Sequence, residues 1–450
     1  MNSVRDTYTC ADRSAVRPLE ILLVGAGITG LSTALALAKT GHSVTVFEFA
    51  SEIKEVGAGI QIPPNASRIL KRLGVLDELV PLMSFPSKAS FRRYDSDDEI
   101  GSSPMMPELG QKYGAPAGIV HRADLQRVLL HAALGQGCRI LTSHSVVAAH
   151  PSFRPRILVL DRQTGARRWW DADVVIAADG IKSTLRKQIT TAIGFQDDPI
   201  PTGDAAYRLL IPRERIQHDP ALLEMLNQNE AVRYMGPGGH VVGYPLRGNM
   251  LYNMVLVHPD ESDNSITDRD CWITRGDRAK MLAFYSSWSP KIRAWISYAD
   301  ESVLDWSLNT YKPLPCWVHG YIALAGDACH PMLPYVAQGA ASGIEDAASL
   351  ARIFTHTDNV PLALSLYQKV RKERAERLAA SASDTGRYLH LRDGPEQQQR
   401  DRQIIHQNVN NRTNDRWRDS EWQDFMFNTD VMRDIDENWE ALVDSAPRQS

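Results

Sequence analysis

A glycine motif near the start of the chain has the spacing of a phosphate-binding turn. Gly25, Gly27 and Gly30 form a GxGxxG pattern between an apolar segment and a helix expected over residues 28–40. The first glycine permits a tight turn, the second lets a pyrophosphate approach the backbone, and the third lets helix and strand pack closely. Glu48 ends the next apolar segment, where a carboxylate can accept hydrogen bonds from ribose hydroxyls. The pattern predicts a dinucleotide site.

Two later segments carry acidic and small residues that a nucleotide cofactor would use. Asp179 follows an apolar run and begins an Asp-Gly turn that leads into a short helix bearing Ser183 and Arg186. Asp327 follows a second apolar run, and a loop of small residues then enters a helix near Ala340. A carboxylate at a strand end can bind hydroxyl groups, and a helix N-terminus can stabilise negative charge on a bound ring. Together the motifs favour FAD over NAD.

The elements that must position these motifs belong to two kinds of sheet. Apolar β-branched strands over residues 20–24 and 43–49 flank the first helix and predict a βαβ unit with parallel strands. Residues 201–306 instead contain short alternating or aromatic segments bounded by Gly, Pro and Asn, which is typical of an antiparallel sheet. Nucleotide-site features resume with a strand over 321–325 and a helix over 339–354. The nucleotide-binding domain is therefore expected to be discontinuous.

Composition argues against several classes of protein. Lys plus Arg total 50 against 54 Asp plus Glu, a net charge of −4, so no basic face for nucleic acid is expected. The 5 cysteines form no CxxC, which indicates neither a disulfide framework nor a metal site and favours the reducing cytoplasm. Residues 21–38 are apolar enough for a membrane span, but their glycines and hydroxyl residues favour a buried strand, turn and helix. We expect no membrane span.

Taken in order, the three motifs resemble those of the FAD-dependent aromatic-ring monooxygenases. These are the group A flavoprotein monooxygenases, the family of salicylate hydroxylase and p-hydroxybenzoate hydroxylase, and the sequence is most similar to its fungal salicylate-hydroxylase-like branch. The resemblance covers residues 20–383. It implies a fold of α/β and antiparallel β structure: a discontinuous Rossmann-like FAD-binding domain, an inserted antiparallel-sheet substrate domain and a helical C-terminal tail.

The chain divides on this basis into five expected segments. They are a flexible leader over 1–17, a FAD-binding domain over 18–200 and 312–385, a substrate domain over 201–311, and a tail over 386–450. The tail is charged but holds large aromatic residues, which predict docking onto the body of the protein. They are Trp417, Trp422, Phe425, Phe427 and Trp439.

The resemblance also assigns cofactor contacts to individual residues. Those for FAD are Gly25, Gly27, Gly30 and Glu48 for the ADP part, Asp327 for the ribityl chain, and Gly59 and Ala340 as further backbone contacts. Arg122 is expected to contact the phosphate or ribityl region, with an ion pair to Asp124 as the alternative. The family binds NADPH, or NADH, without a second dinucleotide fold, through contacts that include the Asp179 region, and the chain has no second GxGxxG.

Two residues of the expected antiparallel sheet are candidates for acting on a substrate. Arg208 is an isolated charge among apolar neighbours, and related phenol hydroxylases place an arginine on this strand, where a cation would stabilise a phenolate. A structural salt bridge is its alternative role. Tyr244 matches a tyrosine-proline turn of the family and would either orient the substrate or pack in the core. Tyr207 and Tyr234 are weaker candidates, and His330 is expected to be a loop hydrogen-bonding group.

The resemblance implies a reaction in two halves. NADPH or NADH reduces the flavin, and the reduced flavin forms a C4a-hydroperoxide with O₂ that hydroxylates an electron-rich ring. The leading substrate is a phenolic or polyketide-derived aromatic ring, in secondary metabolism or aromatic degradation. The alternatives are epoxidation or hydroxylation of an indole alkaloid, and a flavin oxidase or flavin-binding module without monooxygenation. Whether the chain forms a homodimer stays open.

Overall fold

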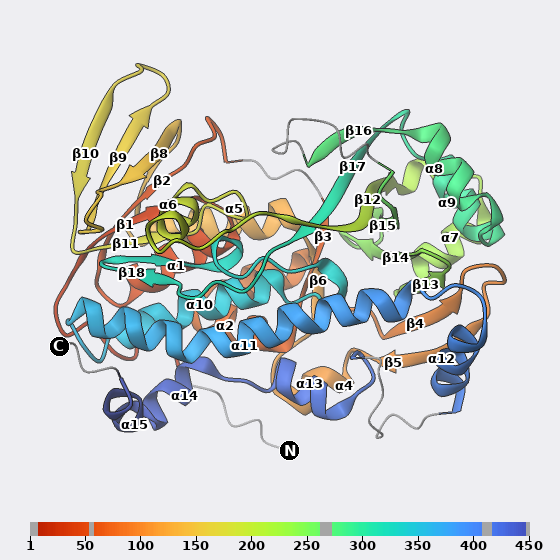
Figure 1. Ribbon diagram of the computed structural model, residues 1–450. Helices are drawn as coiled ribbons and strands as arrows, with labels where there is room; N and C mark the ends of the chain where they lie inside the picture. The colour runs from red at the N-terminus through yellow and green to blue at the C-terminus, as the bar shows by residue number, and fades with distance from the viewer. Residues whose placement is uncertain (1–7, 54–57, 262–271, 407–415, 447–450) are drawn as a thin grey trace.

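The βαβ unit at the start of the chain nucleates a six-stranded sheet. A computed structural model describes residues 8–53, 58–261, 272–406 and 416–446 (Figure 1). The sheet has the order β18-β19-β11-β1-β2-β7, and its pairs are parallel except that of β18 with β19. Its strands are β1 (Glu20–Val24), β2 (Ser43–Phe47), β7 (Arg139–Leu141), β11 (Val174–Ala177), β18 (Val318–His319) and β19 (Ile322–Leu324). Because β19 returns from far along the chain to pair with β11, this domain is discontinuous, as predicted.

Buried helices pack closely around this sheet. The helix α1 (Ile28–Lys39) packs against α5 (Arg122–Gly135) and α10 (Gly339–Phe354). A Cβ atom at Gly343 of α10 would lie 2.0 Å from Oγ1 of Thr29, so only a glycine permits this approach of the two helices. The small residues at this contact are therefore explained by helix packing, without reference to a ligand.

A second, eight-stranded sheet has the order β16-β17-β12-β15-β14-β13-β4-β5. Its strands are β4 (Lys88–Arg93), β5 (Glu99–Pro104), β12 (Ile200–Pro212), β13 (Ala231–Gly236), β14 (Gly239–Leu246), β15 (Leu251–Pro259), β16 (Ile273–Asp277) and β17 (Ser302–Thr310). The pairs are antiparallel except that β4 runs parallel to β13. The sequence division places β4 and β5 in the first FAD-binding segment, whereas the structure joins them to this sheet, because their pairing partner lies more than a hundred residues away.

One face of this sheet, which we call the helix face, is covered by α7 (Pro220–Asn227), α8 (Arg278–Phe284) and α9 (Pro290–Ser297) (Figure 1). Tyr207 and Tyr234 point into this apolar layer, and the Tyr252 ring stacks on Trp295 at 4.0 Å. The opposite face packs against α11 (Val360–Leu389), which runs in blue along the length of the molecule in Figure 1. Tyr207 and Tyr234 therefore face away from any site on that side.

The remaining elements connect and cover the two sheets. A two-stranded ribbon, β3 (Gly59–Ile62) with β6 (Gly118–His121), lies between them, and β8 (His144–Ala149), β9 (Arg156–Asp161) and β10 (Arg167–Asp171) form a separate three-stranded sheet. The other helices are α2 (Pro64–Arg72), α3 (Leu76–Leu79), α4 (Glu108–Tyr113), α6 (Thr184–Ala192), α12 (Pro395–His406), α13 (Ser420–Phe427), α14 (Val431–Glu437) and α15 (Trp439–Asp444). Among the residues that the structure describes, no helix has both the length and the hydrophobicity needed to span a bilayer.

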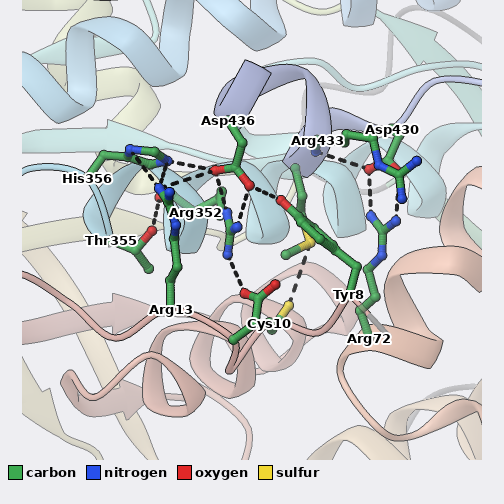
Figure 2. Close-up of polar contacts among 12 residues, drawn as sticks. Tyr8, Cys10, Arg13, Arg72, Arg352, Thr355, His356, Asp430, Arg433 and Asp436 are labelled. Atoms are coloured by element: carbon green, nitrogen blue, oxygen red, sulfur yellow. Dashed lines mark hydrogen bonds and ion pairs between the residues drawn. The ribbon is translucent and has the colours of Figure 1, made fainter. Parts of the chain in front are cut away.

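The N-terminal segment that begins at Tyr8 is docked against the body (Figure 2). Cys10 is buried, and the Tyr8 hydroxyl donates a hydrogen bond to Asp436 of α14. Arg352, near the end of α10, is buried and pairs with both Asp12 and Asp436. A buried guanidinium needs carboxylate partners, and the two chain termini supply them. Over residues 8–17 the structure thus differs from the flexible leader that the sequence suggests, and residues 1–7 lie outside the described ranges.

Candidate active site

The three glycines of the GxGxxG motif lie in one turn but differ in the space around them. Gly25 has φ +95°, and a Cβ atom there would lie 2.5 Å from the carbonyl oxygen of Ala178. A Cβ atom at Gly30 would lie 2.0 Å from the carbonyl oxygen of Gly25. At Gly27, by contrast, a Cβ atom would meet no described atom within 4 Å. Gly25 and Gly30 are required by the fold, whereas the space beside Gly27 is open to a ligand.

The start of α1 has the donors that a pyrophosphate needs. Gly27 is the N-cap residue of this helix and has no side chain that could accept from the first-turn N–H groups. Such groups, together with the helix dipole, bind phosphate readily. Glu48 lies at the rim of the same turn, where its carboxylate accepts from the backbone N–H of Ala26 at 2.7 Å and of Ala50 at 2.8 Å. These residues fit the ADP portion of FAD.

Two residues of α5 connect this helix to neighbouring segments of the site. Gln126, which sequence reasoning missed, donates to the carbonyl oxygen of Ala26 at 3.1 Å. Arg122 begins α5, and its backbone N–H donates to the carbonyl oxygen of Ala58 at 2.9 Å. Asp124 forms an ion pair with Arg247 at 2.9 Å. The turn of α5 therefore brings Arg122 to the segment that precedes Gly59.

Asp179 and Asp327 lie where two neighbouring parallel strands end. Asp179 follows β11 and accepts from the backbone N–H of Thr184 at 3.0 Å, and burial raises the pKa of its carboxyl group. Asp327 follows β19, and its side chain is exposed. The carboxyl ends of adjacent parallel strands form the edge at which α/β sheets bind nucleotides. Both carboxylates thus stand at the predicted edge of the six-stranded sheet.

A buried charge network fixes the helix that begins beside Ala340. Asp346 of α10 accepts from Arg371 at 2.9 Å, from the backbone N–H of Gly326 at 2.8 Å and from His330 at 2.6 Å. Burial disfavours charge on His330, but its neighbours Cys329 and Asp346 outweigh burial and raise its pKa well above the ordinary value. His330 is therefore a hydrogen-bonding group of this loop, as the sequence suggested.

The register of the eight-stranded sheet places both substrate candidates on one face. Arg208 lies opposite Val255, which lies opposite Val242, and Leu210 lies likewise in one row with Asn253 and Tyr244. Directly opposed residues in paired strands face the same side, as do residues two apart along a strand. We call this side, which carries Asp204, Arg208, Arg233, His240, Val242, Tyr244 and Asn253, the site face.

Tyr244 and Gly59, predicted separately, contact each other. The Tyr244 hydroxyl donates to the Gly59 carbonyl oxygen at 3.1 Å, and the Gly59 N–H donates to Oδ1 of Asn253 at 2.9 Å. A Cβ atom at Gly59 would lie 2.4 Å from the Tyr244 ring. Burial raises the pKa of Tyr244, against a lowering by the charge of Arg208, so the hydroxyl stays neutral. The guanidinium of Arg208 lies 4.4 Å from the ring centre of Trp306.

A cluster that sequence reasoning missed lies further along the same face. His240 Nδ1 is 2.7 Å from Nε2 of His390, the residue that caps the end of α11. His390 Nδ1 is 3.4 Å from the carboxylate of Asp204, which also accepts from the Tyr335 hydroxyl at 2.9 Å. Asp204, Tyr335 and His390 line a pocket of about 1000 Å³ that also reaches Glu396.

The electrostatics of this cluster favour an uncharged imidazole at its centre. Burial, followed by the charges of His390 and Arg233, holds the pKa of His240 well below its usual value. Residues an even number of positions apart on a strand face the same side. The spacing from Tyr244 could therefore have placed His240 on the site face, and the spacing from Arg208 could have placed Asp204 there. No such signal exists for Tyr335 and His390, which come from other segments of the chain.

Comparison with known proteins places this geometry among flavoproteins. The family model described as "FAD binding domain" matches residues 18–263 and 308–382. The FAD-dependent monooxygenase OpS4 of Beauveria bassiana is 35% identical over 436 residues, covering 95% of this chain and 97% of that protein. The 3-amino-4-hydroxybenzoate 2-monooxygenase PtmB3 of Streptomyces platensis is 32% identical over 387 residues, covering 85% and 92%. A salicylate hydroxylase substrate complex superposes with a TM-score of 0.73 at 25% identity, covering 96% and 99%.

Proposed function

Because the chain belongs to the FAD-binding family of group A flavoprotein monooxygenases and is a FAD-dependent monooxygenase, we propose that it hydroxylates an electron-rich phenolic ring with NADPH or NADH as co-substrate. PtmB3 and salicylate hydroxylase are named for phenolic acids, which supports a phenolic substrate. The observation that carries the proposal is the site face, which holds a cation (Arg208), a neutral imidazole (His240) and a buried tyrosine (Tyr244) that is hydrogen-bonded to Gly59.

The residues present fit FAD, with the glycine turn and Glu48 holding the ADP portion and Asp327 the ribityl chain. When bound, FAD supplies the redox chemistry, accepting a hydride from NAD(P)H and then activating O₂ for transfer of one oxygen atom to the ring. The protein supplies orientation, charge and protection from water. Gly59, held by Tyr244 and Asn253, offers a rigid backbone edge for the cofactor, and the helix that begins beside Ala340 offers a second.

The side chains of the site face have complementary roles toward a phenol. Arg208 stabilises negative charge on the phenolic oxygen, which makes the ring more nucleophilic. The neutral imidazole of His240 accepts the phenolic proton, because its low pKa keeps it unprotonated near neutral pH. His390, hydrogen-bonded to His240, and Asp204, paired with His390, then provide a polar route from the site face to the pocket. Tyr244 positions the backbone of Gly59.

Substrate-stimulated oxidation of NADPH, coupled to a hydroxylated product, tests this function. We expect the purified protein to bind roughly one FAD per chain and to accelerate flavin reduction when a correct phenol is added. A His240→Gln variant should retain FAD but lose most product formation, and the loss should shrink only as the pH approaches the pKa of the free phenol, about 10. Turnover of indoles but not of phenols would replace the proposed substrate class, and NADPH oxidation without product would replace monooxygenation by an oxidase activity.

A further inference from the structure

The C-terminal segment returns to cover the site face. After α12, the chain at Trp417 lies against the eight-stranded sheet, and the indole N–H of Trp417 donates to the carbonyl oxygen of Tyr335 at 3.1 Å. Gln423 of α13 donates to the carbonyl oxygen of Trp417, and Arg418 donates to that of Ile404 at 2.6 Å. These hydrogen bonds fix Trp417 between the sheet and the loop that precedes α10.

Trp417 closes a small cavity directly over the site face. The cavity has a volume of about 20 Å³, close to the space of one water molecule. The eight-stranded sheet contributes the floor of the cavity, and Gln61, Met105 and Trp417 complete its lining. The sheet residues are Ala89, Phe91, Ala231, Val232, Arg233 and Val242. The Trp417 ring centre is 5.2 Å from the guanidinium of Arg233, which also lies 5.6 Å from the ring centre of Phe91.

The position of this cavity relates it to the proposed chemistry. Val242, on its floor, stands between His240 and Tyr244 on the same face, and its row across the sheet leads through Val255 to Arg208. Gln61 lies two residues after Gly59 in β3. Val242 therefore stands among the three candidate side chains, and a ring bound over Val242 would meet the Trp417 indole, which lines the same cavity.

We propose that Trp417 determines the size of the aromatic substrate, an inference that rests on the proposed function. Its indole occupies space that a second fused ring would need, and the hydrogen bond to Tyr335 prevents it from swinging aside. The C-terminal segment thereby forms a wall of the substrate site. Substitution by a smaller residue enlarges the site at this wall and leaves the proposed FAD contacts untouched.

Other aromatic residues of the tail provide a matched control. Trp422 is also half-buried and lies in the same segment, but it packs on Phe425 at 4.9 Å and on Arg416 at 4.5 Å. It does not line the cavity over Val242. Replacing Trp422 therefore disturbs the docking of the tail without enlarging the substrate site.

The test compares one-ring and two-ring phenols in the FAD-loaded full chain. The probes are phenol with 2-naphthol and salicylate with 3-hydroxy-2-naphthoate, and binding is measured from the change in flavin absorbance. In the Trp417→Ala variant, we expect the Kd of each two-ring probe to fall relative to its one-ring partner by about tenfold or more, the scale of pocket misfit. Product formation should shift in the same direction.

Two further variants make each outcome decisive. Trp417→Phe retains an aromatic side chain and should give a smaller shift of the same sign, which tests the inference even if Trp417→Ala fails to fold. An unchanged size preference in both Trp417 variants, or an equal shift in Trp422→Ala, would overturn the role of Trp417. Failure of the wild-type protein to bind or turn over any of the four phenols would instead overturn the proposed function.

Discussion

Arg208 and Tyr244 differ in how their surroundings constrain them. Tyr244 is buried and hydrogen-bonded to the backbone of Gly59, so it holds β3 against the eight-stranded sheet. Arg208 is half-buried over the Trp306 ring, and its charge opposes, without outweighing, the rise that burial causes in the pKa of Tyr244. Low-polarity surroundings strengthen the field of a cation, which is the physical basis of the effect that we propose for Arg208 on a negative substrate oxygen.

The Arg208→Ala variant tests this role. We expect FAD content to stay at the wild-type level and product formation to fall by about 100-fold, the scale of losing one charge-stabilising donor. Stopped-flow turnover with a hydroxylated phenol measures the effect. Tyr244→Phe is the comparison variant: it leaves the cation in place but removes the hydrogen bond to Gly59, so we expect it to weaken FAD retention. Normal turnover by Arg208→Ala would make Arg208 a structural charge only.

At the scale of elements, the turn between β1 and α1 shows that one motif has two functions. Gly25 and Gly30 are required because any side chain would collide with backbone atoms of the turn and of the residue after β11. Gly27 is not required by the described part of the protein. Its conformation, with φ −72°, is also open to other residues. We infer that Gly27 is a glycine because of the cofactor.

The pair Gly27→Ala and Gly30→Ala separates these functions. For Gly27→Ala, we expect the stability of the FAD-free protein to change by no more than about 1 kcal/mol. Crowding of the pyrophosphate should nevertheless weaken FAD binding by about tenfold or more, since overpacking typically costs about 1–3 kcal/mol. Gly30→Ala should lower the stability of the FAD-free protein itself. Thermal unfolding without FAD and titration with FAD give the two readouts, and equal behaviour of the variants would contradict the assignment.

At the scale of the whole molecule, the two termini are joined through α10. Asp436 near the C-terminus contacts Tyr8, Arg352 and His356, and Asp12 near the N-terminus contacts the same Arg352 (Figure 2). Hydrogen bonds from Arg352, Tyr8 and His356 outweigh burial and lower the pKa of Asp436 to about 2. We call the cluster of Tyr8, Asp12, Arg352, His356 and Asp436 the joint. It lies at the opposite end of α10 from Ala340, so its effect on the site is indirect.

Asp436→Asn should destabilise the protein without changing its chemistry. Because Arg352 keeps Asp12 and Asp436 is partly exposed, we expect a loss of about 2–4 kcal/mol, at or below the usual range for a broken buried pair. Urea unfolding measures it, and turnover per bound FAD should be unchanged. Asp358→Asn, which breaks an exposed pair with Arg17, should cost less than about 1 kcal/mol. Equal losses in both variants would show that the joint has no special role.

Stability should also depend on pH through His42. Burial lowers the pKa of His42 from 6.5 to about 4, and its Nδ1 accepts from the backbone N–H of Leu19. The unfolded chain therefore binds a proton that the folded chain excludes, so stability falls as pH drops from about 6.5 to 4. At about 1.4 kcal/mol per pKa unit, the loss approaches roughly 3 kcal/mol. His42→Gln should flatten unfolding free energy against pH in this window, and an unchanged slope would refute this origin.

Local features of the fold could be predicted from the sequence because they depend on neighbouring residues. The strand Glu20–Val24 and the helix Gly339–Phe354 begin and end where apolar periodicity and glycine indicated. The predicted α/β and antiparallel architecture with a returning strand is confirmed. The placement of the glycine turn, Glu48 and Asp327 at strand ends could be predicted for the same reason.

Only the tertiary structure decided how distant segments meet. Strand register placed Arg208, His240 and Tyr244 on one face and turned Tyr207 and Tyr234 to the other, because a shift of one residue reverses every side chain. Pairing of β4 with β13 moved two strands into the second sheet. Most of all, His390 and Trp417 reach the site face from segments whose own sequence has no motif, since their positions depend on packing between elements far apart in the chain.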